Sequence, residues 1–338
     1  MKLFLSLALF AAFLLCPTAC ADGVREGLSL AAVQTLPALF PFFVVSGLLV
    51  RCDTARLSPL LAKPLARLYG LPPEAAPALV LGLIGGYPVG AATACALLSE
   101  GVLSREAAER VNRFCNCASP GFCIGLVGLG VFGSAQAGAI LYGIHIVSAL
   151  IVGLFFARTP LSALSQRIHN RNRTSFPSIF CASVQQAAST ALTVTAFLTM
   201  FSILLRLLSP VFALLPYGNV LDGMIELTNG LDELTVLTLP RRTRLASFLL
   251  GFGGLAVQFQ VRALAEAHDL PVRGLFAAKL LHGTLAAVLT AFLFSLSPAV
   301  LTVSSPELTP ISVRFRYTLA VLFVSALYPI LGWKKRRK

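Results

Sequence analysis

Apolar runs long enough to cross a lipid bilayer recur along this chain from its first residues almost to its last. A hydrocarbon core of about 30 Å takes roughly 20 helical residues to cross. Hydrophobic residues make up 57% of the 338 residues and charged residues 12%, whereas a typical soluble domain carries about 25% charged residues. The sequence therefore predicts an all-α, polytopic helical membrane protein without a large soluble domain. Its apolar segments lie at about 3–20, 31–50, 77–99, 112–132, 137–157, 186–209, 219–240, 245–264, 275–297 and 313–333.

The basic residues stand in short clusters between the apolar runs and give the chain a formal net charge of +13. Arginine and lysine are enriched in the cytoplasmic loops of membrane proteins, where they also contact anionic lipids. We therefore interpret the charge as a topology signal and expect membrane lipids, and no nucleic acid, as partners. A nucleic-acid-binding or partner-binding role of the basic tail is the alternative. The main clusters are Arg51 to Arg67, Arg158 to Arg173 and Lys334 to Lys338.

Two apolar segments differ from ordinary spans. Residues 77–99 are interrupted by Gly85-Gly-Tyr-Pro88, and residues 219–240 carry several acidic side chains, among them Glu226. If both segments enter the membrane and return to the same side, the basic loops and the basic tail all face the cytoplasm. The positive-inside rule thus favours about eight spans and two re-entrant hairpins. One cluster, Arg241-Arg-Thr-Arg244, is left on the outer side without an explanation.

The two halves of the chain match at a fixed offset. His145 and His282 differ by 282 − 145 = 137 positions, and the same offset places Gly85 to Gly90 on Asp222 to Leu227. Each half then holds a span, an interrupted hairpin and two further spans. Because three crossings is an odd number, the second copy is inserted upside down. Inverted repeats with broken helices are an architecture of secondary transporters.

These features divide the chain into five parts. The apolar run after Lys2 and the small residues Thr18 to Ala21 also fit a cleavable signal peptide, so both interpretations stay open, and we favour a retained helix. The predicted parts are an N-terminal hydrophobic helix or signal-like segment (1–27), a first repeat (28–160), a cytoplasmic basic linker (161–185), a second repeat (186–297), and a C-terminal helix with a basic tail (298–338).

The first interrupted segment is a candidate binding site. Irregular backbone within a membrane is tolerated only where it is buried in protein or lines a wet cavity. The glycines remove side-chain bulk and the proline removes a donor, which suits a hairpin tip whose free N–H groups face an anion or a polar ligand. Tight helix packing is the alternative. The candidate residues are Gly85, Gly86, Tyr87 and Pro88.

The second interrupted segment places an ionisable group, Glu226, in an apolar run. A carboxylate at the bilayer centre costs about 2.5–3.5 kcal/mol, so it indicates a cavity, an ion or a partner. We expect Glu226 to receive a coupling proton or cation, with Thr228 and Asn229 as further ligands. A structural hydrogen-bond network or an exposed loop is the alternative.

Polar residues next to both hairpins complete the candidate site. Amides within spans either join helices or line a permeation route, and their occurrence at matching places in both halves favours the second role. Lys279 and His282 share a helical face, where we expect Lys279 to extend to the membrane interface. We interpret His145 as a packing residue rather than a proton relay. The further predicted solute ligands are Asn116, Ser119, Gly253 and Gln258.

No pattern of residues indicates catalysis, a cofactor or a metal. The eight cysteines lie mostly in apolar segments, and Cys115-Asn-Cys117 lacks the paired CxxC spacing of a zinc site. No GxSxG, HExxH or GxxxxGK[ST] motif occurs in a suitable context. We therefore predict that the protein is not an enzyme, binds no metal and needs no cofactor. Homo-oligomerisation stays open.

Six short motifs are Leu36 to Ser46, Gly85 to Gly90, Glu106 to Arg110, Phe114 to Asn116, Glu226 to Gly230 and Gly251 to Gln258. Through them, residues 28–297 resemble the sporulation integral membrane proteins of the YlbJ type. The resemblance implies a bacterial inner-membrane protein needed, in spore formers, for building the spore cortex. It also implies a Gate, or nucleoside-recognition, domain, which looks similar to parts of concentrative nucleoside transporters and ferrous-iron permeases. At Phe114 to Pro120 the chain departs from the family pattern.

Repeats, broken segments and resemblance together predict a permease. The hairpin tips 85–90 and 226–230 are expected to meet near the membrane midplane and to gate a small polar solute, with nucleosides as the first class to test. A non-transporting structural or assembly protein of the spore or cell envelope is the alternative. It predicts copurifying partners and no dependence on a solute.

Overall fold

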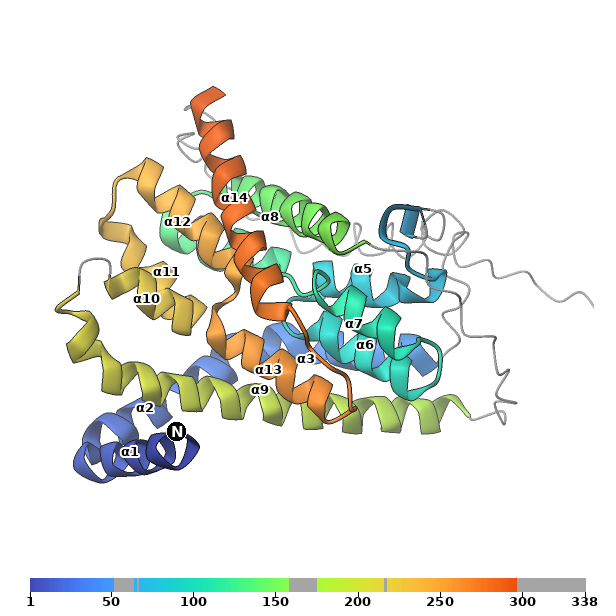
Figure 1. Ribbon diagram of the computed structural model, residues 1–338, viewed down its shortest axis with the longest axis horizontal. Helices are drawn as coiled ribbons and strands as arrows, with labels where there is room; N and C mark the ends of the chain where they lie inside the picture. Colours follow the sequence, from blue (N-terminus) through green and yellow to red (C-terminus); the bar gives the residue numbers. More distant parts are fainter. Residues whose placement is uncertain (52–63, 66, 158–174, 216–217, 297–338) are drawn as a thin grey trace, which may run out of the picture.

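The computed structural model describes residues 1–51, 64–65, 67–157, 175–215 and 218–296, and all regular elements within these ranges are helices, with no strand (Figure 1). The α-helices are α1 (Lys2–Leu15), α2 (Pro17–Ser29), α3 (Leu36–Arg51), α5 (Ala76–Gly85), α6 (Val89–Ser99), α7 (Arg105–Asn112), α8 (Ala135–Phe156), α9 (Phe176–Phe212), α10 (Gly218–Ile225), α11 (Leu227–Glu233), α12 (Leu239–Phe252), α13 (Gly254–Glu266) and α14 (Leu275–Leu296). Two π-helices, η1 (Leu30–Thr35) and η4 (Gly121–Val131), and two short 3-10 helices, η3 (Pro73–Ala75) and η5 (Leu234–Val236), join them.

Within the described ranges, 5 helical stretches are long and apolar enough to cross a membrane, which confirms a polytopic helical protein. Each stretch contains or closely matches one of the predicted spans at 31–50, 137–157, 186–209, 245–264 and 275–297. The predicted segment 313–333 lies outside the described residues, as does the whole predicted part 298–338. The 5 stretches are Pro17–Arg51, Ala135–Phe156, Phe176–Phe212, Leu239–Glu266 and Leu275–Leu296.

The N-terminal boundaries differ from the prediction. The expected span 3–20 is divided at Cys16, which is non-helical because the residue before a proline, here Pro17, is sterically kept out of the α-region. The next helix then runs without interruption to Arg51, so the boundary expected after residue 27 falls inside it. Similarly, the end of the predicted linker 161–185 belongs to α9, which begins at Phe176.

Both predicted hairpins are present. Helices α5 and α6 fold back on each other around Gly86, and a Cβ added at Gly82 would lie 2.8 Å from the Cα of Gly90. Helices α10 and α11 fold back around Glu226, and a Cβ added at Gly223 would lie 3.1 Å from the Cα of Gly230. In each hairpin a pair of glycines therefore lets the two arms pack backbone to backbone.

Two further spans that the sequence predicted as continuous are broken. Segment 112–132 begins at the last residue of α7, the residues between there and Pro120 are non-helical, and helix resumes only with η4. Pro120 cannot donate the backbone hydrogen bond that would continue the helix toward α7. Segment 245–264 is divided at Gly253, whose left-handed backbone, with φ 78°, ends α12. Besides the break at Cys16, the described residues therefore have four interruptions, two at hairpin tips and two within spans.

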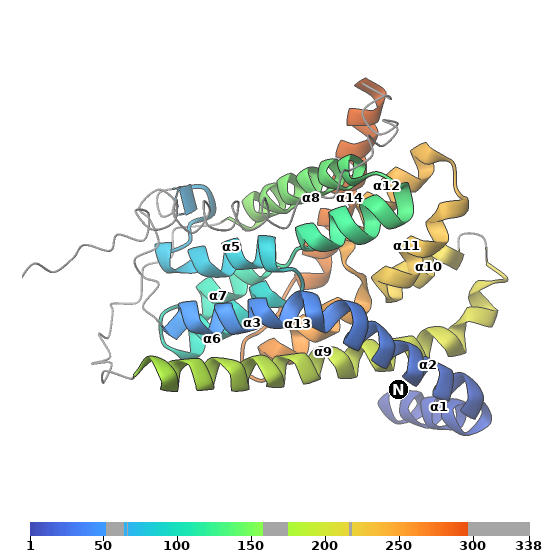
Figure 2. The same cartoon turned by 180° about the vertical axis from the view of Figure 1, so that it is seen from behind.

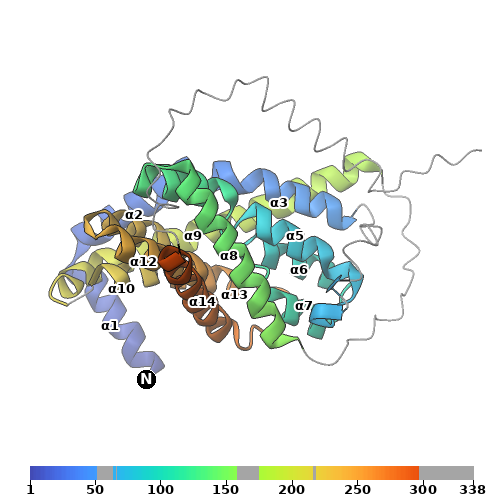
Figure 3. The same ribbon diagram turned by 90° about the horizontal axis from the view of Figure 1, so that it is seen from above.

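The order of elements occurs twice. A hairpin, a broken helix and an unbroken helix of 22 residues follow one another as α5–α6, α7–η4 and α8, and again as α10–α11, α12–α13 and α14. Helix α14 crosses α8 (Figure 1 and Figure 3), and the equivalent residues His145 and His282 stack with ring centroids 4.5 Å apart. The two copies are therefore in direct contact at equivalent residues.

The helices that precede the two hairpins also pack together. Helix α9, with 37 residues, runs along α2 and α3 (Figure 2). A Cβ added at Gly27 would lie 2.4 Å from the Cα of Thr199, and one added at Gly47 would lie 3.0 Å from the side chain of Ser183. These closely packed helices form one side of the molecule, next to the two hairpins.

The cluster at Arg241 to Arg244 has a structural role. The Arg242 guanidinium donates to the carbonyl oxygen of Val131 at 3.3 Å and to that of Leu237 at 3.0 Å, and it also donates to Thr235. It therefore joins the start of α12 to the end of η4. The predicted topology places both of these helix ends on the outer side of the membrane. At the opposite end of the molecule, Arg113 donates to the Arg273 carbonyl oxygen at 2.9 Å.

Candidate functional site

Three of the four interruptions, at Gly86, at Ser119 and at Glu226, line a cavity of about 380 Å³, which we call the hairpin cavity. Volumes of this order are typical of small-molecule sites. Its wall is mostly apolar, with a small number of hydroxyl, amide and carboxyl groups. The lining residues are Gln34, Thr35, Ala38, Leu39, Gly86, Tyr87, Ala118, Ser119, Gly121, Phe122, Leu126, Leu198, Glu226, Leu227, Thr228, Val257 and Gln260.

Glu226 is the buried acid of the cavity and is only 3% exposed. It occupies the single residue between α10 and α11, and its Oε2 accepts a hydrogen bond from the Asn229 backbone N–H at 3.0 Å. Thr228 offers its own N–H to the same carboxylate. The side chain thus caps the N-terminus of α11, where the helix dipole favours negative charge. The carboxylate holds the hairpin tip in shape and also lines the cavity.

The tip of the first hairpin faces Glu226 across the cavity. Gly86 has a φ of 92°, and a Cβ built on it would lie 3.1 Å from the Cβ of Ser119, so the position requires glycine. The next residue, Tyr87, donates its hydroxyl hydrogen to the Leu250 carbonyl oxygen in the last turn of α12. The first hairpin is thereby attached to the broken helix of the second repeat.

The second hairpin also contacts this broken helix. Gly254, the first residue of α13, lies so close that an added Cβ would be 3.2 Å from the Leu227 nitrogen and 3.6 Å from the Glu226 Cα. A Cβ added at Gly253 would lie 3.4 Å from the Tyr87 ring. The break between α12 and α13 therefore touches both hairpin tips. The meeting of the two tips with each other near the membrane midplane stays a prediction.

The structure divides the predicted solute ligands into two groups. Gly86, Tyr87, Ser119, Glu226 and Thr228 line the hairpin cavity. The other predicted ligands are described by the structure but do not line the cavity; these are Gly85, Pro88, Asn116, Asn229, Gly253 and Gln258.

Two of the residues that do not line the cavity act on the backbone. Asn116 accepts from the Ala91 N–H at 2.9 Å and donates to the Asn112 carbonyl oxygen at 2.8 Å, which attaches the unwound stretch to the first turn of α6. Gln258 donates to the Phe252 carbonyl oxygen at 3.2 Å and so bridges the break between α12 and α13. Broken helices leave such groups without intrahelical partners, and these amides replace them.

Sequence reasoning missed part of the lining. Gln34 and Thr35 belong to η1, a π-helical stretch inside an apolar run, and a π-helix has no clear sequence signal. Gln260, two residues after the predicted ligand Gln258, is buried at the cavity wall. π-Helical stretches occur frequently at functional sites.

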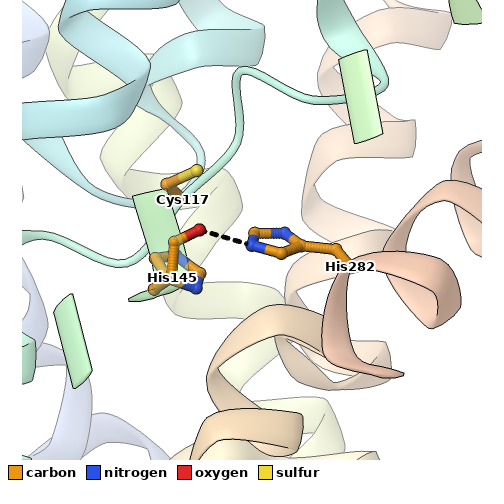
Figure 4. A group of neighbouring side chains, drawn as sticks. All are labelled: Cys117, His145 and His282. Carbon is orange, nitrogen blue, oxygen red and sulfur yellow. Dashed lines mark hydrogen bonds between the residues drawn. The ribbon is translucent and has the colours of Figure 1, made fainter. Parts of the chain in front are cut away.

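A second polar cluster lies next to the cavity and was not predicted. The ligand atoms of Cys117, His145 and His282 lie within 4.8 Å of one another, and all three residues are buried (Figure 4). Cysteine and histidine are the ligands that zinc prefers. That the protein binds no metal stays a prediction. The hydrogen bonds of the three side chains show which ring nitrogens could bind a metal ion.

The hydrogen bonds fix the tautomer of each ring. His145 Nε2 accepts from the Ala118 N–H at 2.9 Å, so its proton is on Nδ1, which has no partner among the described residues. His282 Nε2 donates to the His145 carbonyl oxygen at 2.9 Å, which leaves Nδ1 as an acceptor 3.4 Å from the Lys279 ammonium. A metal-bound histidine donates its other ring N–H, whereas His145 accepts at Nε2. This arrangement opposes metal binding.

Lys279 does not extend to the membrane interface, contrary to the prediction. It is 2% exposed and points to the unwound stretch of the first repeat, where Nζ lies 2.9 Å from the Asn116 carbonyl oxygen. The prediction was wrong because a helical face alone does not say whether lipid or a broken helix covers it.

Comparisons with known proteins identify the family of the chain. No family model matches it, and no solved structure matches it. The chain is similar to the sporulation integral membrane protein YlbJ of Bacillus subtilis (strain 168), with 30% identity over an alignment of 320 residues. The alignment covers 82% of this chain and 78% of the relative. Together with the spans described above, this makes the chain a multi-pass protein of a bacterial membrane. It belongs to the family of the sporulation integral membrane protein YlbJ.

Proposed function

We propose that this protein is a permease for a small polar solute and that the hairpin cavity is its binding site. The observation that carries the proposal is the convergence of both hairpin tips on a cavity with a buried carboxylate, Glu226. Discontinuous helices that meet between two repeats are typical of the substrate sites of secondary transporters. Nucleosides are the first class to test.

The composition of the wall supports a solute with one apolar and one polar face. Phe122, Leu198 and Val257 offer apolar or aromatic surface, whereas Ser119 and Gln260 offer hydrogen-bonding groups. A flat ring that carries hydroxyl and amide groups, as in a nucleoside, matches this division. Because polar groups of a site reject analogues that leave them unpaired, we expect discrimination among solutes to depend on the hydroxyls and amides.

Glu226 is the proposed coupling residue. Its carboxylate is buried, so a proton or cation taken up there neutralises a charge that the interior disfavours. It is also a helix cap, and a useful substitution must separate these two roles. Glutamine removes the charge and keeps an amide oxygen that can accept from the Asn229 N–H.

Glu226→Gln is expected to reduce gradient-dependent solute uptake at least about tenfold while the protein stays folded, because the coupling charge is lost and the cap is kept. The measurement is uptake into proteoliposomes that contain the purified variant, with nucleosides, nucleobases and amino acids as solutes. Glu266→Gln, an exposed acid at the end of α13, is the matched control and should transport like the wild type. Undiminished uptake by Glu226→Gln would remove its coupling role.

The alternative is a non-transporting structural or assembly protein of the spore or cell envelope. The name of the relative supports it, since that name states sporulation and integral membrane insertion and no transport. In this case Glu226 serves only as a helix cap. Uptake would then be absent for the whole panel with wild-type protein, and proteins of the envelope would copurify with it.

A further inference from the structure

The Lys279 ammonium is enclosed by three acceptors. Nζ lies 2.9 Å from the Asn116 carbonyl oxygen, 3.4 Å from His282 Nδ1 and 4.8 Å from the centroid of the Tyr87 ring. An ammonium has three hydrogens to donate, and an aromatic face attracts a cation. Among the described residues, no carboxylate lies within ion-pair distance of Nζ. The site is therefore shaped for an ammonium and is not an ion pair.

The acceptors come from parts of the chain that are far apart in sequence. Asn116 lies in the unwound stretch of the first repeat, Tyr87 at the tip of the first hairpin, and Lys279 and His282 on α14 of the second repeat. The break at Gly253 is adjacent, since a Cβ added there would lie 3.4 Å from the Lys279 Cε. One charged group thus connects α14 with two interruptions of the other repeat, next to the stacked rings of His145 and His282.

We infer that these acceptors form a monovalent-cation site that the chain fills with its own ammonium. Unwound carbonyls of broken helices coordinate the coupling cation in many secondary transporters, and here the Asn116 carbonyl oxygen holds Lys279 instead. The internal cation holds the two repeats together. The inference concerns binding and stability, so it holds or fails independently of solute transport.

The acceptor set selects the kind of cation. One carbonyl oxygen, one imidazole nitrogen and one aromatic face suit an alkylammonium, whereas sodium, magnesium and calcium require several oxygen ligands. Zinc would require the His282 Nδ1 lone pair, which Lys279 occupies. An internal ammonium and a zinc ion bound by Cys117, His145 and His282 therefore exclude each other.

Chemical rescue tests the inference. Lys279→Ala removes the atoms that correspond to propylammonium and leaves the acceptors in place. We expect the full-length variant in detergent to melt at least about 5 °C below the wild type. Propylammonium chloride should restore most of this loss, with a half-maximal concentration on the order of 1 mM, as the small size of the ligand suggests.

The controls separate charge from volume. Propanol at the same concentration has nearly the same shape without the charge and should not rescue Lys279→Ala, and sodium chloride should not either. Lys279→Met fills the space without the ammonium, so it should be destabilised and not respond to propylammonium. Equal rescue by propanol, or a Lys279→Ala protein as stable as the wild type, would overturn the inference.

A further measurement uses the wild-type protein and does not depend on the folding of any Lys279 variant. We expect zinc chloride and chelators to leave its melting temperature unchanged, because the ammonium holds the His282 lone pair. A melting temperature that rises with zinc, and no longer does so in Cys117→Ser, would overturn the inference in favour of a metal site.

Discussion

Replacing Gly283 by leucine is expected to destabilise the protein more than any other single change considered for this fold. Helix α14 crosses α12 where Gly283 faces Gly251, and a Cβ on Gly283 would lie 2.6 Å from the Phe248 carbonyl oxygen. Backbone cannot withdraw as a side chain can, so the helices must separate. They would lose the Ser247–Thr290 hydroxyl hydrogen bond at 2.5 Å, and the cost is expected to exceed about 3 kcal/mol.

The measurement is thermal unfolding of the purified protein, with size-exclusion chromatography to detect aggregated material. Gly143→Leu is the matched control, because Gly143 also lies in a 22-residue helix, two positions from His145, and an added Cβ there meets nothing within 4 Å. Gly143→Leu should melt like the wild type. A Gly283→Leu protein that melts within about 2 °C of the wild type would contradict the described crossing of α12 and α14.

Arg110→Met is expected to destabilise the protein by about 3 kcal/mol. The Arg110 side chain is buried and its Nη1 donates to the carbonyl oxygens of Tyr69 at 3.4 Å and Gly70 at 3.2 Å. Methionine fills much of the same volume but leaves both buried carbonyl groups without this donor. An unsatisfied buried polar group costs about 1–3 kcal/mol, and two are affected here.

Chemical or thermal unfolding of the purified variants measures this loss. Arg110→Lys keeps the charge and lacks the planar fork of donors, so its stability should lie between that of the wild type and that of Arg110→Met. Arg105→Met, at the exposed start of the same helix, is the matched control and should have little effect. Equal stability of the Arg105 and Arg110 variants would show that the two carbonyl contacts do not stabilise the fold.

Much of the architecture could be predicted from local composition. Apolar length predicted the long helices, and Gly85 to Pro88 and Glu226 marked the two hairpin tips, because glycine, proline and a carboxylate are each costly inside an ordinary span. The offset between His145 and His282 also pointed to the repeats, and the two rings are in contact. Local sequence was sufficient at the two hairpin tips, where residues that an ordinary span disfavours mark the interruption.

The other two interruptions were not predicted. Glycine is frequent in transmembrane helices, so the sequence indicated Gly253 as a solute ligand within a continuous span and not as a break. Only the surrounding helices decide that Gly253 adopts a left-handed backbone there. The stretch before Pro120 carries the polar residues Asn112, Arg113, Asn116 and Ser119, but the strongly apolar run that follows Pro120 kept the average of segment 112–132 apolar and concealed the break.

The roles of individual polar residues depended on tertiary contacts. Asn116 and Gln258 were predicted to bind solute, and the structure uses both to satisfy backbone groups at the breaks. Arg110 belonged to a motif without an assigned role, and it holds two buried carbonyl groups. Periodicity gives the face of a helix on which a residue lies, and it does not give the partner that covers this face.

The most direct test of the account is the melting temperature of the wild-type protein against a panel of nucleosides, nucleobases, amino acids and metal ions. A ligand at a hundred times its Kd adds about 2.7 kcal/mol of stability, which such a measurement detects readily. We predict that one class of polar solute raises the melting temperature and that Ser119→Leu, which fills the hairpin cavity, abolishes this rise. No rise across the panel, or a rise that Ser119→Leu leaves intact, would contradict the assignment of this cavity as a solute site.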